Sequence, residues 1–444
     1  MANNAHLVAV RDRVLAEMAK ADVAGADPFD GLESRLFRKS GLMGFRMARL
    51  AWLQAIKRGP GWLRSLAMIP PLRNGKTLAL LQGAAGGVGL CDFRADLVAL
   101  QNDDGGWGYP FAWQARAFYA KRGQSNAIVT SFVVDALMAA GMADDDPVMG
   151  RAAVFLSRLW RDGFFAYIDH SDAEVHNVSL WAAWALHRID PANRLIGSAV
   201  NRVLAAQKPD GSWAYGTRSH HRFIDGFHTG YVLDLLDRFR RAGDGGMVGL
   251  DKAIGRGYGF YRAKCFDGDG FPQSFAGRDG YVDCHAVAQS IASLCRFGAV
   301  AEAKRIADWA IETLFDANRG VFYAGLGRFG PDRRVYMRWT QAWMVWALSI
   351  VIEKTAMIDA FDPTMPLIFS HPDPARPAKE DALRVLSEGA FRELFHVTRI
   401  EAQKMRASGD MEALYGLTRG LKTLQRIGGD RGIVLNARRS KVAL

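Results

Sequence analysis

The stretch EVHNVSLWAAWALHRI, residues 174–189, is apolar on nearly every side after a polar opening. A helix of this kind belongs in the interior of a protein, whereas a helix with one charged side faces water. The same design recurs along the chain, and each copy opens on polar or ionisable residues. The other four copies are SNAIVTSFVVDALMAAG (125–141), FIDGFHTGYVLDLLDRF (223–239), YVDCHAVAQSIASLCRF (281–297) and YMRWTQAWMVWALSIVI (336–352).

The copies follow one another at a nearly constant period. Helices with a charged face lie between them, for example NRLIGSAVNRVLAAQ (193–207), and end in an Asp/Gly/aromatic turn such as QKPDGSWAYG (207–216). Glycine permits the tight reversal, and the aromatic ring can pack between neighbouring hairpins. The late leucines of the five copies, Leu137, Leu186, Leu236, Leu294 and Leu348, are 49, 50, 58 and 54 residues apart.

Buried and half-charged helices that alternate about every 50 residues predict an inner ring and an outer ring. The expected fold is all-α, an (α/α)6-type toroid of helical hairpins. Five hairpins are evident, so the ring is either incomplete or closed by helices from the ends of the chain. We place the toroid in residues 77–362, after an N-terminal helical arm (1–76) and before a linker with a C-terminal helical extension (363–444).

The C-terminal extension opens on a proline-rich segment, HPDPARPAKED (371–381), which is typical of a linker. Two further helices are predicted beyond it. Because nothing in this part carries an evident chemical motif, we expect a role in packing or dimerisation. The oligomeric state itself does not follow from the sequence.

The charge of the chain is concentrated in the N-terminal arm. Of a net charge of +11, nearly all comes from residues 35–76, which hold ten Lys or Arg residues and no Asp or Glu. Trp, Phe and Leu residues are interleaved with these cations, as in amphipathic helices that lie on anionic membranes. We therefore expect peripheral membrane contact through residues 35–76, or an arm that packs on the toroid with its cations in water. No nucleic-acid motif accompanies the patch, so nucleic acid is not an expected partner.

No cofactor, metal ion or membrane span is expected from the sequence. The four cysteines, Cys91, Cys265, Cys284 and Cys295, form no zinc-binding pattern, and VDCH at 282–285 crowds its candidate ligands too closely for joint coordination. The glycine-rich segments do not follow a strand, as nucleotide-binding motifs do. Without a signal peptide or a long apolar run, we expect a cytoplasmic protein, peripheral at most on the inner face of the cytoplasmic membrane.

The inner helices of such a ring run in one direction, so their N-terminal ends meet at one mouth. Aspartates there have an ordinary role as helix caps, and a lone buried histidine is usually a core residue. Several unlike ionisable residues at the same level of different repeats nevertheless favour a polar pocket. The candidate catalytic residues at this mouth are Asp225, Asp283, His176, His228, His285 and Tyr231.

The preceding turns and the same helix starts supply candidate binding residues. Flat aromatic rings beside amides, carboxylates and histidines suit a sugar, whose ring has apolar faces and polar edges. Arginine can pair in bidentate fashion with a carboxylate, such as that of a uronic acid. The candidate substrate-binding residues are Asp104, Trp107, Tyr109, Trp113, Gln114, Asn126, His221, Arg222, Arg338, Trp339 and Gln341.

Together these motifs resemble a bacterial and archaeal family encoded with polysaccharide-biosynthesis genes. The resemblance rests on DGGWGYPFAWQARAF, EVHNVSLWAAWAL, QKPDGSWAYG, IDGFHTGYVLDLL, VDCHAVAQSI and YMRWTQAWMVWAL, over roughly residues 75–355. It implies the six-hairpin glycosidase and N-acylglucosamine 2-epimerase type of (α/α) toroid. It implies no particular reaction.

Two further resemblances come with departures from their patterns. RWTQAW at 338–343 is similar to the W-x-Q-A-E segment of N-acylglucosamine 2-epimerases, but Trp343 stands where that segment has an acid. QKPDGSWAYG resembles the Q-W repeats of squalene and terpene cyclases, which use a related barrel. Those cyclases protonate an alkene with a D-x-D-D motif that this sequence lacks.

The residues and the resemblance favour an enzyme of cell-surface or exopolysaccharide biosynthesis that acts on a glycan or a lipid-linked saccharide. A hydrolase would use Asp225 and Asp283 as its carboxylate pair. An epimerase or lyase acting on a uronic acid would use a histidine or Tyr231 as base, with Arg222 or Arg338 neutralising the carboxylate. The alternatives are a non-catalytic glycan-binding or assembly protein and an isoprenoid enzyme of the terpene-cyclase type.

Overall fold

The computed structural model describes residues 4–84, 92–116, 118–243, 247–278, 280–359, 362–370, 373 and 376–435. Cys91 lies outside these ranges. The described chain is predominantly helical, and its strands form two- and three-stranded sheets of two or three residues per strand. The predicted all-α class is confirmed. A search of the described helices finds none long and apolar enough to cross a membrane.

Six helices form the inner ring, five of them where the repeat places them. The sixth is α5, whose sequence GKTLALLQGA continues directly from the basic arm and has only a short apolar run after its polar opening. It packs against α7 on one side and against the π-helical turn Met337–Ala342, which leads into α15, on the other. The ring is therefore complete. Its helices are α5 (Gly75–Ala84), α7 (Ala127–Ala139), α9 (His176–Ile189), α11 (Gly226–Ala242), α13 (Cys284–Arg296) and α15 (Trp343–Asp359).

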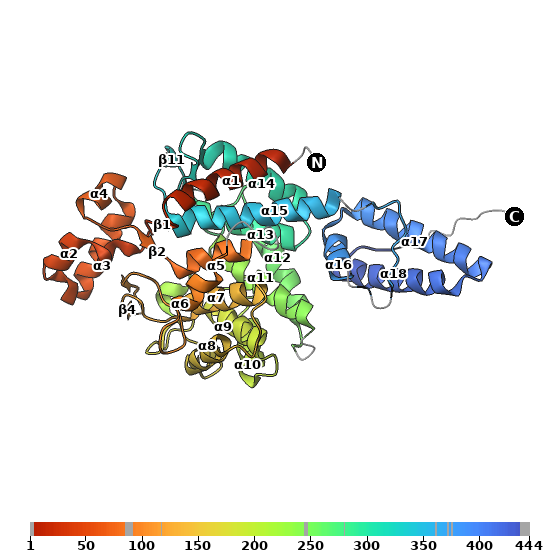
Figure 1. Ribbon diagram of the computed structural model, residues 1–444, viewed down its shortest axis with the longest axis horizontal. Helices are drawn as coiled ribbons and strands as arrows, with labels where there is room; N and C mark the ends of the chain where they lie inside the picture. The colour runs from red at the N-terminus through yellow and green to blue at the C-terminus, as the bar shows by residue number, and fades with distance from the viewer. Residues whose placement is uncertain are drawn as a thin grey trace. The chain divides into compact units, whose positions relative to one another are not determined.

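The outer ring is closed by the N-terminal helix, which is one of the two alternatives left open by the sequence. His6 on this helix contacts Asp308 on the last outer helix, with Nε2 2.6 Å from Oδ1. Figure 1 shows the same helix running beside α14. The outer helices are α1 (Ala5–Lys20), α6 (Arg94–Ala99), α8 (Pro147–Arg158), α10 (Arg194–Ala205), α12 (Leu250–Lys264) and α14 (Val300–Leu314).

The Asp/Gly/aromatic turns lock one outer helix to the next. In the turn after α10, the Trp213 indole N–H donates to the carbonyl of Val203, 2.9 Å away. The Gln207 amide donates to the carbonyls of Gly211 and of Ala253 on α12, both at 2.9 Å. Gly211 has a φ of +91°, a conformation that only glycine adopts without strain.

The turn after α6 repeats this arrangement. The Trp107 indole N–H donates to the carbonyl of Leu97 at 2.7 Å, and Gln101 reaches the carbonyls of Gly105 and Val148, each at 2.9 Å. The repeat seen in the sequence is thus a repeat of hydrogen bonds. The tryptophan of the turn packs between hairpins, as the sequence predicts.

The part of the N-terminal arm that follows α1 is an insertion between α1 and α5. Its ends are held together by the antiparallel pair β1 (Ala24–Gly25) and β2 (Leu72–Arg73). Leu32, Phe37, Leu53 and Ala112 form its small apolar core, with Trp52 stacked on Phe37 at 5.1 Å. The arm contains the 3-10 turns Asp30–Glu33 and Leu42–Gly44 and the helices α2 (Arg35–Lys39), α3 (Arg46–Arg58) and α4 (Gly61–Leu66).

The chain divides into two compact units. One comprises His6–Ser293 and Arg305–Ser349, and the other groups Leu294–Lys304 with the chain from Ile350 onward. The second unit contains α16 (Arg376–Val385), α17 (Glu388–Ser408) and α18 (Met411–Asp430). Helix α16 begins inside the proline-rich segment, so the second half of the expected linker is helical.

A pair of glycines on α12 tests the packing of the repeat. A Cβ atom on Gly257 would lie 2.5 Å from the buried Trp213 ring, whereas a Cβ on Gly255 would meet nothing within 4 Å. We expect Gly257→Ala to lower the free energy of unfolding by about 2 kcal/mol, because the rigid indole cannot move aside. Gly255→Ala should raise it by up to about 1 kcal/mol through helix propensity. Urea unfolding of both variants measures this, and equal stabilities would contradict the packing.

Candidate functional site

A cavity of about 730 Å³ lies at the N-terminal ends of the inner helices. It is the mouth predicted from the direction of the repeats, and aromatic side chains form most of its wall. Nine of the residues singled out in the sequence line it. They are Tyr109, Trp113, Asp225, His228, Tyr231, Asp283, His285, Arg338 and Trp339.

Helix geometry selects which residue of each inner helix faces the cavity. The second residue does so in five helices, as Lys76, Ile128, Asn177, Phe227 and His285 show. The first residue lies about 100° away around the helix and points elsewhere. His176 is such a first residue: it is buried beside Glu174, 3.8 Å away, and does not line the cavity.

His228 and Asp225 form a hydrogen-bonded pair on α11. The carboxylate caps the helix by accepting the backbone N–H of His228 at 2.8 Å, and its other oxygen lies 2.7 Å from Nδ1 of the same histidine. A carboxylate in this position holds the imidazole with Nδ1 protonated, which leaves Nε2 as the basic nitrogen. The capping explanation for Asp225 is therefore correct, and the same carboxylate also orients a cavity-lining histidine.

Tyr231 and His285 form a second pair between α11 and α13. The Tyr231 hydroxyl lies 2.7 Å from Nε2 of His285. The imidazole is stacked between Phe227 at 4.5 Å and Trp343 at 4.4 Å. Burial and the nearby cations lower the pKa of His285 well below its usual range, and burial raises the pKa of Tyr231. Both groups are neutral near pH 7, so the hydrogen bond between them joins two uncharged side chains.

Asp283 is an acidic group of the cavity with a raised pKa. It accepts the Trp339 indole N–H at 2.8 Å and the backbone N–H of His285 at 2.8 Å. Burial nevertheless raises its pKa to about 6, because desolvation outweighs these two hydrogen bonds. Asp283 therefore changes charge in the range where enzymes commonly use a carboxyl group as acid or base.

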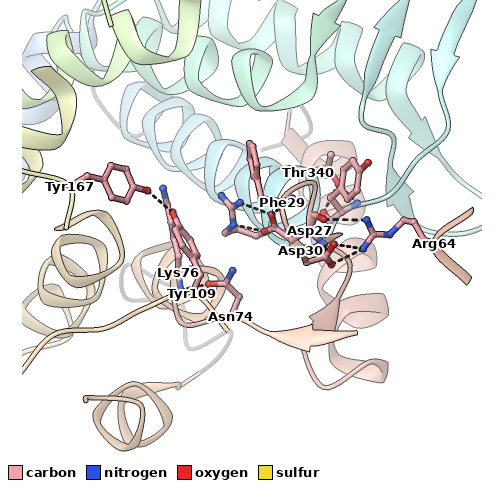
Figure 2. A network of polar contacts seen from close by, with 11 residues as sticks. Asp27, Phe29, Asp30, Arg64, Asn74, Lys76, Tyr109, Tyr167 and Thr340 are labelled. Carbon is pink, nitrogen blue, oxygen red and sulfur yellow. Dashed lines mark hydrogen bonds and ion pairs between the residues drawn. The ribbon is translucent and has the colours of Figure 1, made fainter. Parts of the chain in front are cut away.

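Arg338 is held by a carboxylate from the N-terminal segment. Its Nε and Nη2 atoms lie 2.6 and 2.9 Å from the two oxygens of Asp27, and both side chains are buried. Asp30, next in the same segment, accepts two hydrogen bonds from Arg64 at 2.6 Å (Figure 2). The Arg338 guanidinium, predicted to pair with a substrate carboxylate, is thus already paired with the carboxylate of Asp27.

Lys76 is a cavity residue that the sequence analysis assigned to the basic arm. It is the second residue of α5, and its ammonium lies 3.8 Å from the Phe132 ring centre and 5.9 Å from that of Tyr231. Within the described ranges its ammonium has neither a hydrogen-bond nor an ion-pair partner. Burial, with Arg338 nearby, lowers its pKa well below the usual lysine range. An anion bound beside Lys76 would oppose that effect.

Several candidate binding residues lie outside the cavity and have structural partners. Asn126 caps α7, and the Gln341 amide pairs with both backbone groups of Phe322 at 2.8 and 2.7 Å. Asp104 accepts the Ser125 hydroxyl at 2.6 Å. Trp107 lies in the turn described above.

The other three lie near smaller hollows or the surface. Gln114 accepts the Arg49 guanidinium at 2.9 Å and lines a second groove next to the arm. His221 packs edge-on against Tyr215 at 5.1 Å, and Arg222 is exposed beside a shallow pocket. Of residues 220–228, the main cavity is lined by Phe223, Asp225, Phe227 and His228.

Most of the cations of the cavity were not predicted from the sequence. Lys57, Arg58 and Arg334 line it in addition to Lys76 and Arg338, against the two carboxylates Asp225 and Asp283. The signal for Lys76 was the apolar run that follows it, which marks an inner helix. Lys57 and Arg58 come from the arm, whose fold brings them to the mouth from outside the repeat. Among the residues that the structure describes, no three His, Cys, Asp or Glu side chains are grouped as a metal site.

None of the known protein-family models matches this sequence, and no curated protein does. Solved structures with a similar helix arrangement include D-mannose isomerase, at 11% identity and a TM-score of 0.48 over 63% of this chain and 86% of that one. Cellobiose 2-epimerase from Bacillus thermoamylovorans is 12% identical, with a TM-score of 0.47 over 63% of this chain and 88% of that one. The type II terpene cyclase MstE from Scytonema is 13% identical, with a TM-score of 0.47 over 80% of this chain and 98% of that one. All three scores are below 0.5.

The buried Asp27–Arg338 pair is open to a stability test. Asp27→Asn leaves the Arg338 guanidinium buried without its counter-charge, and we expect a loss of about 3 kcal/mol in the free energy of unfolding. Asp27→Asn combined with Arg338→Gln removes both charges and should be less destabilised than the sum of the two single variants. Urea unfolding of the three variants measures the coupling. Strictly additive losses would show that the two side chains do not depend on each other.

Asp283 gives a prediction for the pH dependence of stability. Its folded-state pKa of about 6 is higher than that of an unfolded aspartate, about 3.9. The stability it contributes is therefore present below about pH 4 and is lost as the pH rises through about 6. Asp283→Asn should remove this part of the slope, and Asp145→Asn, in an exposed turn, should keep it. Urea unfolding from pH 4 to 7 decides, and an unchanged slope in Asp283→Asn would contradict the burial argument.

Proposed function

We propose that this protein is a sugar-modifying enzyme that moves a proton at a carbon next to a carboxylate, as in epimerisation or elimination at C5 of a uronic acid residue. The observation that carries the proposal is the oriented His228–Asp225 pair in an aromatic cavity that also presents Lys76 without an anionic partner among the described residues. A base and an anion-binding cation are the two groups that such a reaction needs.

In this proposal His228 is the base. Its Nδ1 is held by Asp225, so Nε2 accepts the proton and the carboxylate stabilises the resulting imidazolium. The Tyr231 ring lies beside it, with ring centres 6.1 Å apart. The Tyr231 hydroxyl, hydrogen-bonded to neutral His285, can return a proton to the sugar carbon or to the leaving oxygen.

Lys76 takes the part that the sequence analysis gave to Arg222 or Arg338. Arg338 is engaged by Asp27, and Arg222 does not line the cavity. Charge that develops on the substrate carboxylate during proton removal would be stabilised by the Lys76 ammonium in a site of low polarity. The rings around the cavity offer flat faces for the C–H side of a sugar.

One observation favours a second candidate, a terpene-cyclase-like enzyme. Asp283 keeps its proton up to about pH 6 within an aromatic wall, and a protonated carboxyl group is what an alkene substrate requires. The cations Lys76 and Arg338 oppose this reading, because a carbocation would form close to them. Cyclisation of a polyprenyl substrate that is abolished by Asp283→Asn would establish it.

Deuterium exchange tests the proposed reaction directly. With uronic acid oligosaccharides in deuterated water, NMR should show deuterium at C5, or absorbance should show the unsaturated product of elimination. We expect His228→Ala to slow this by about 100-fold or more, the usual contribution of a general base. Arg222→Ala, outside the cavity, should leave the rate unchanged.

A variant of the proposed anion-binding residue separates catalysis from binding. Lys76→Met should weaken binding of the oligosaccharides in calorimetry and slow the exchange as well. Binding without exchange in the unmodified protein would indicate a glycan-binding protein instead. Exchange that persists in His228→Ala at the original rate would exclude His228 as the base.

A further inference from the structure

Large apolar side chains are exposed together on the N-terminal arm. Phe45, Met47, Trp62 and Leu66 leave 62 to 69% of their surfaces open to solvent. Single exposed apolar residues are common, but a group of them on one small element marks a surface that contacts something apolar. The other members of this group, which we call the arm patch, are Leu36, Leu42 and Met68.

The charge around the arm patch identifies the kind of surface it fits. Residues 35–76 carry ten cations and no acid. Some of these cations serve the fold, as Arg64 does on Asp30, but Arg35, Lys39 and Arg46 are exposed beside the apolar side chains. Apolar and cationic residues interleaved on short helices match an anionic lipid bilayer, with the apolar groups in the interface and the cations at the headgroups.

A groove of about 590 Å³ runs from the arm patch along one side of α3. Met47, Leu50, Ala51 and Gln54 form this wall, spaced as one face of a helix requires, and Trp113–Arg116 form the facing wall. Met47 belongs both to the arm patch and to the groove. The groove is therefore continuous with the exposed apolar surface and is itself largely apolar.

The inner end of the groove opens into the main cavity. Lys57 and Arg58, about 15 Å along the helix from Met47, line both, as do Phe29 and Trp113. The Lys57 ammonium lies 4.5 Å from the Phe29 ring centre. Neither Lys57 nor Arg58 has an ion-pair partner in the described part of the chain. Two such cations at the end of an apolar groove match a phosphate attached to a lipid chain.

We propose that the groove binds the hydrocarbon chain of a lipid phosphate that enters from an anionic bilayer, with the phosphate on Lys57 and Arg58. The arm patch is the part of the protein that rests on the bilayer. This assignment concerns binding and is independent of the reaction proposed above. If both hold, the substrate of the main cavity is a lipid-linked saccharide.

Vesicle flotation tests the arm patch. The full-length protein should float with vesicles of equimolar phosphatidylglycerol and phosphatidylcholine and remain behind with phosphatidylcholine alone. Phe45→Ser, Trp62→Ser and Leu66→Ser together should abolish flotation. The control Val154→Ser, Val248→Ser and Phe329→Ser changes apolar residues elsewhere that are at least as exposed as Leu66, and it should float like the unmodified protein. Flotation retained by the first triple variant, or equal on both vesicles, overturns the assignment, as does a DNA duplex that competes with the vesicles.

Calorimetry with dodecyl phosphate tests the groove without turnover. Dodecyl phosphate should bind at least about 10-fold more tightly than inorganic phosphate, since each buried methylene contributes about 0.8 kcal/mol. Ala51→Trp fills the groove and should weaken this binding, whereas Ala55→Trp, one turn further along the helix and not part of the groove wall, should not. The double variant Lys57→Met with Arg58→Met should weaken the binding of both dodecyl phosphate and inorganic phosphate. Unchanged affinity in Ala51→Trp, or equal affinity for the two phosphates, overturns the groove site.

Discussion

The buried ion pair between Asp27 and Arg338 joins the two ends of the toroid sequence. Arg338 lies in the π-helical turn that begins the last inner helix, and Asp27 lies in the segment that leaves the first outer helix. The Met337 N–H donates to the carbonyl of Ala26 at 2.9 Å beside it. Because a buried charge is costly without its partner, this contact fixes both segments at once. Phe29, two residues after Asp27, is thereby placed in the wall of the main cavity and of the groove.

The same constraint explains the division of labour among the cations. Arg338 and Arg64 form ion pairs with Asp27 and Asp30, which hold the arm in place. Lys76, in contrast, faces the cavity, and Lys57 and Arg58 face the junction of the cavity with the groove. Around Tyr231 the cavity gathers a histidine–carboxylate pair, a neutral histidine and a lysine. These residues place hydrogen-bond donors, hydrogen-bond acceptors and a base on one surface, which an apolar core does not. Its aromatic walls lower the local polarity and strengthen every electrostatic contact inside.

The agreement between sequence and structure is closest where a pattern repeats. The hydrophobic period located five inner helices and the direction in which they run, and from this the mouth where Asp225, His228, Tyr231, Asp283 and His285 meet. It did not locate α5, because that helix is short and its polar opening continues the basic arm. It placed His176 in the site, but a rotation of one residue turns that side chain away from the cavity. A periodic pattern fixes the level of a residue along the axis more securely than its direction around it.

The sequence by itself determined the all-α ring, the inner and outer helices and the group of ionisable residues at one mouth, since burial and helical period are local properties. Only the tertiary structure decided which residues share the cavity. Lys57 and Lys76 line it, and Asp27 holds the cavity residue Arg338, yet all three lie outside the five recognised repeats. Asp27 and Arg338 are 311 residues apart. No local pattern carries that information. The charge balance of the cavity follows from long-range packing, and with it the chemistry that the site can support.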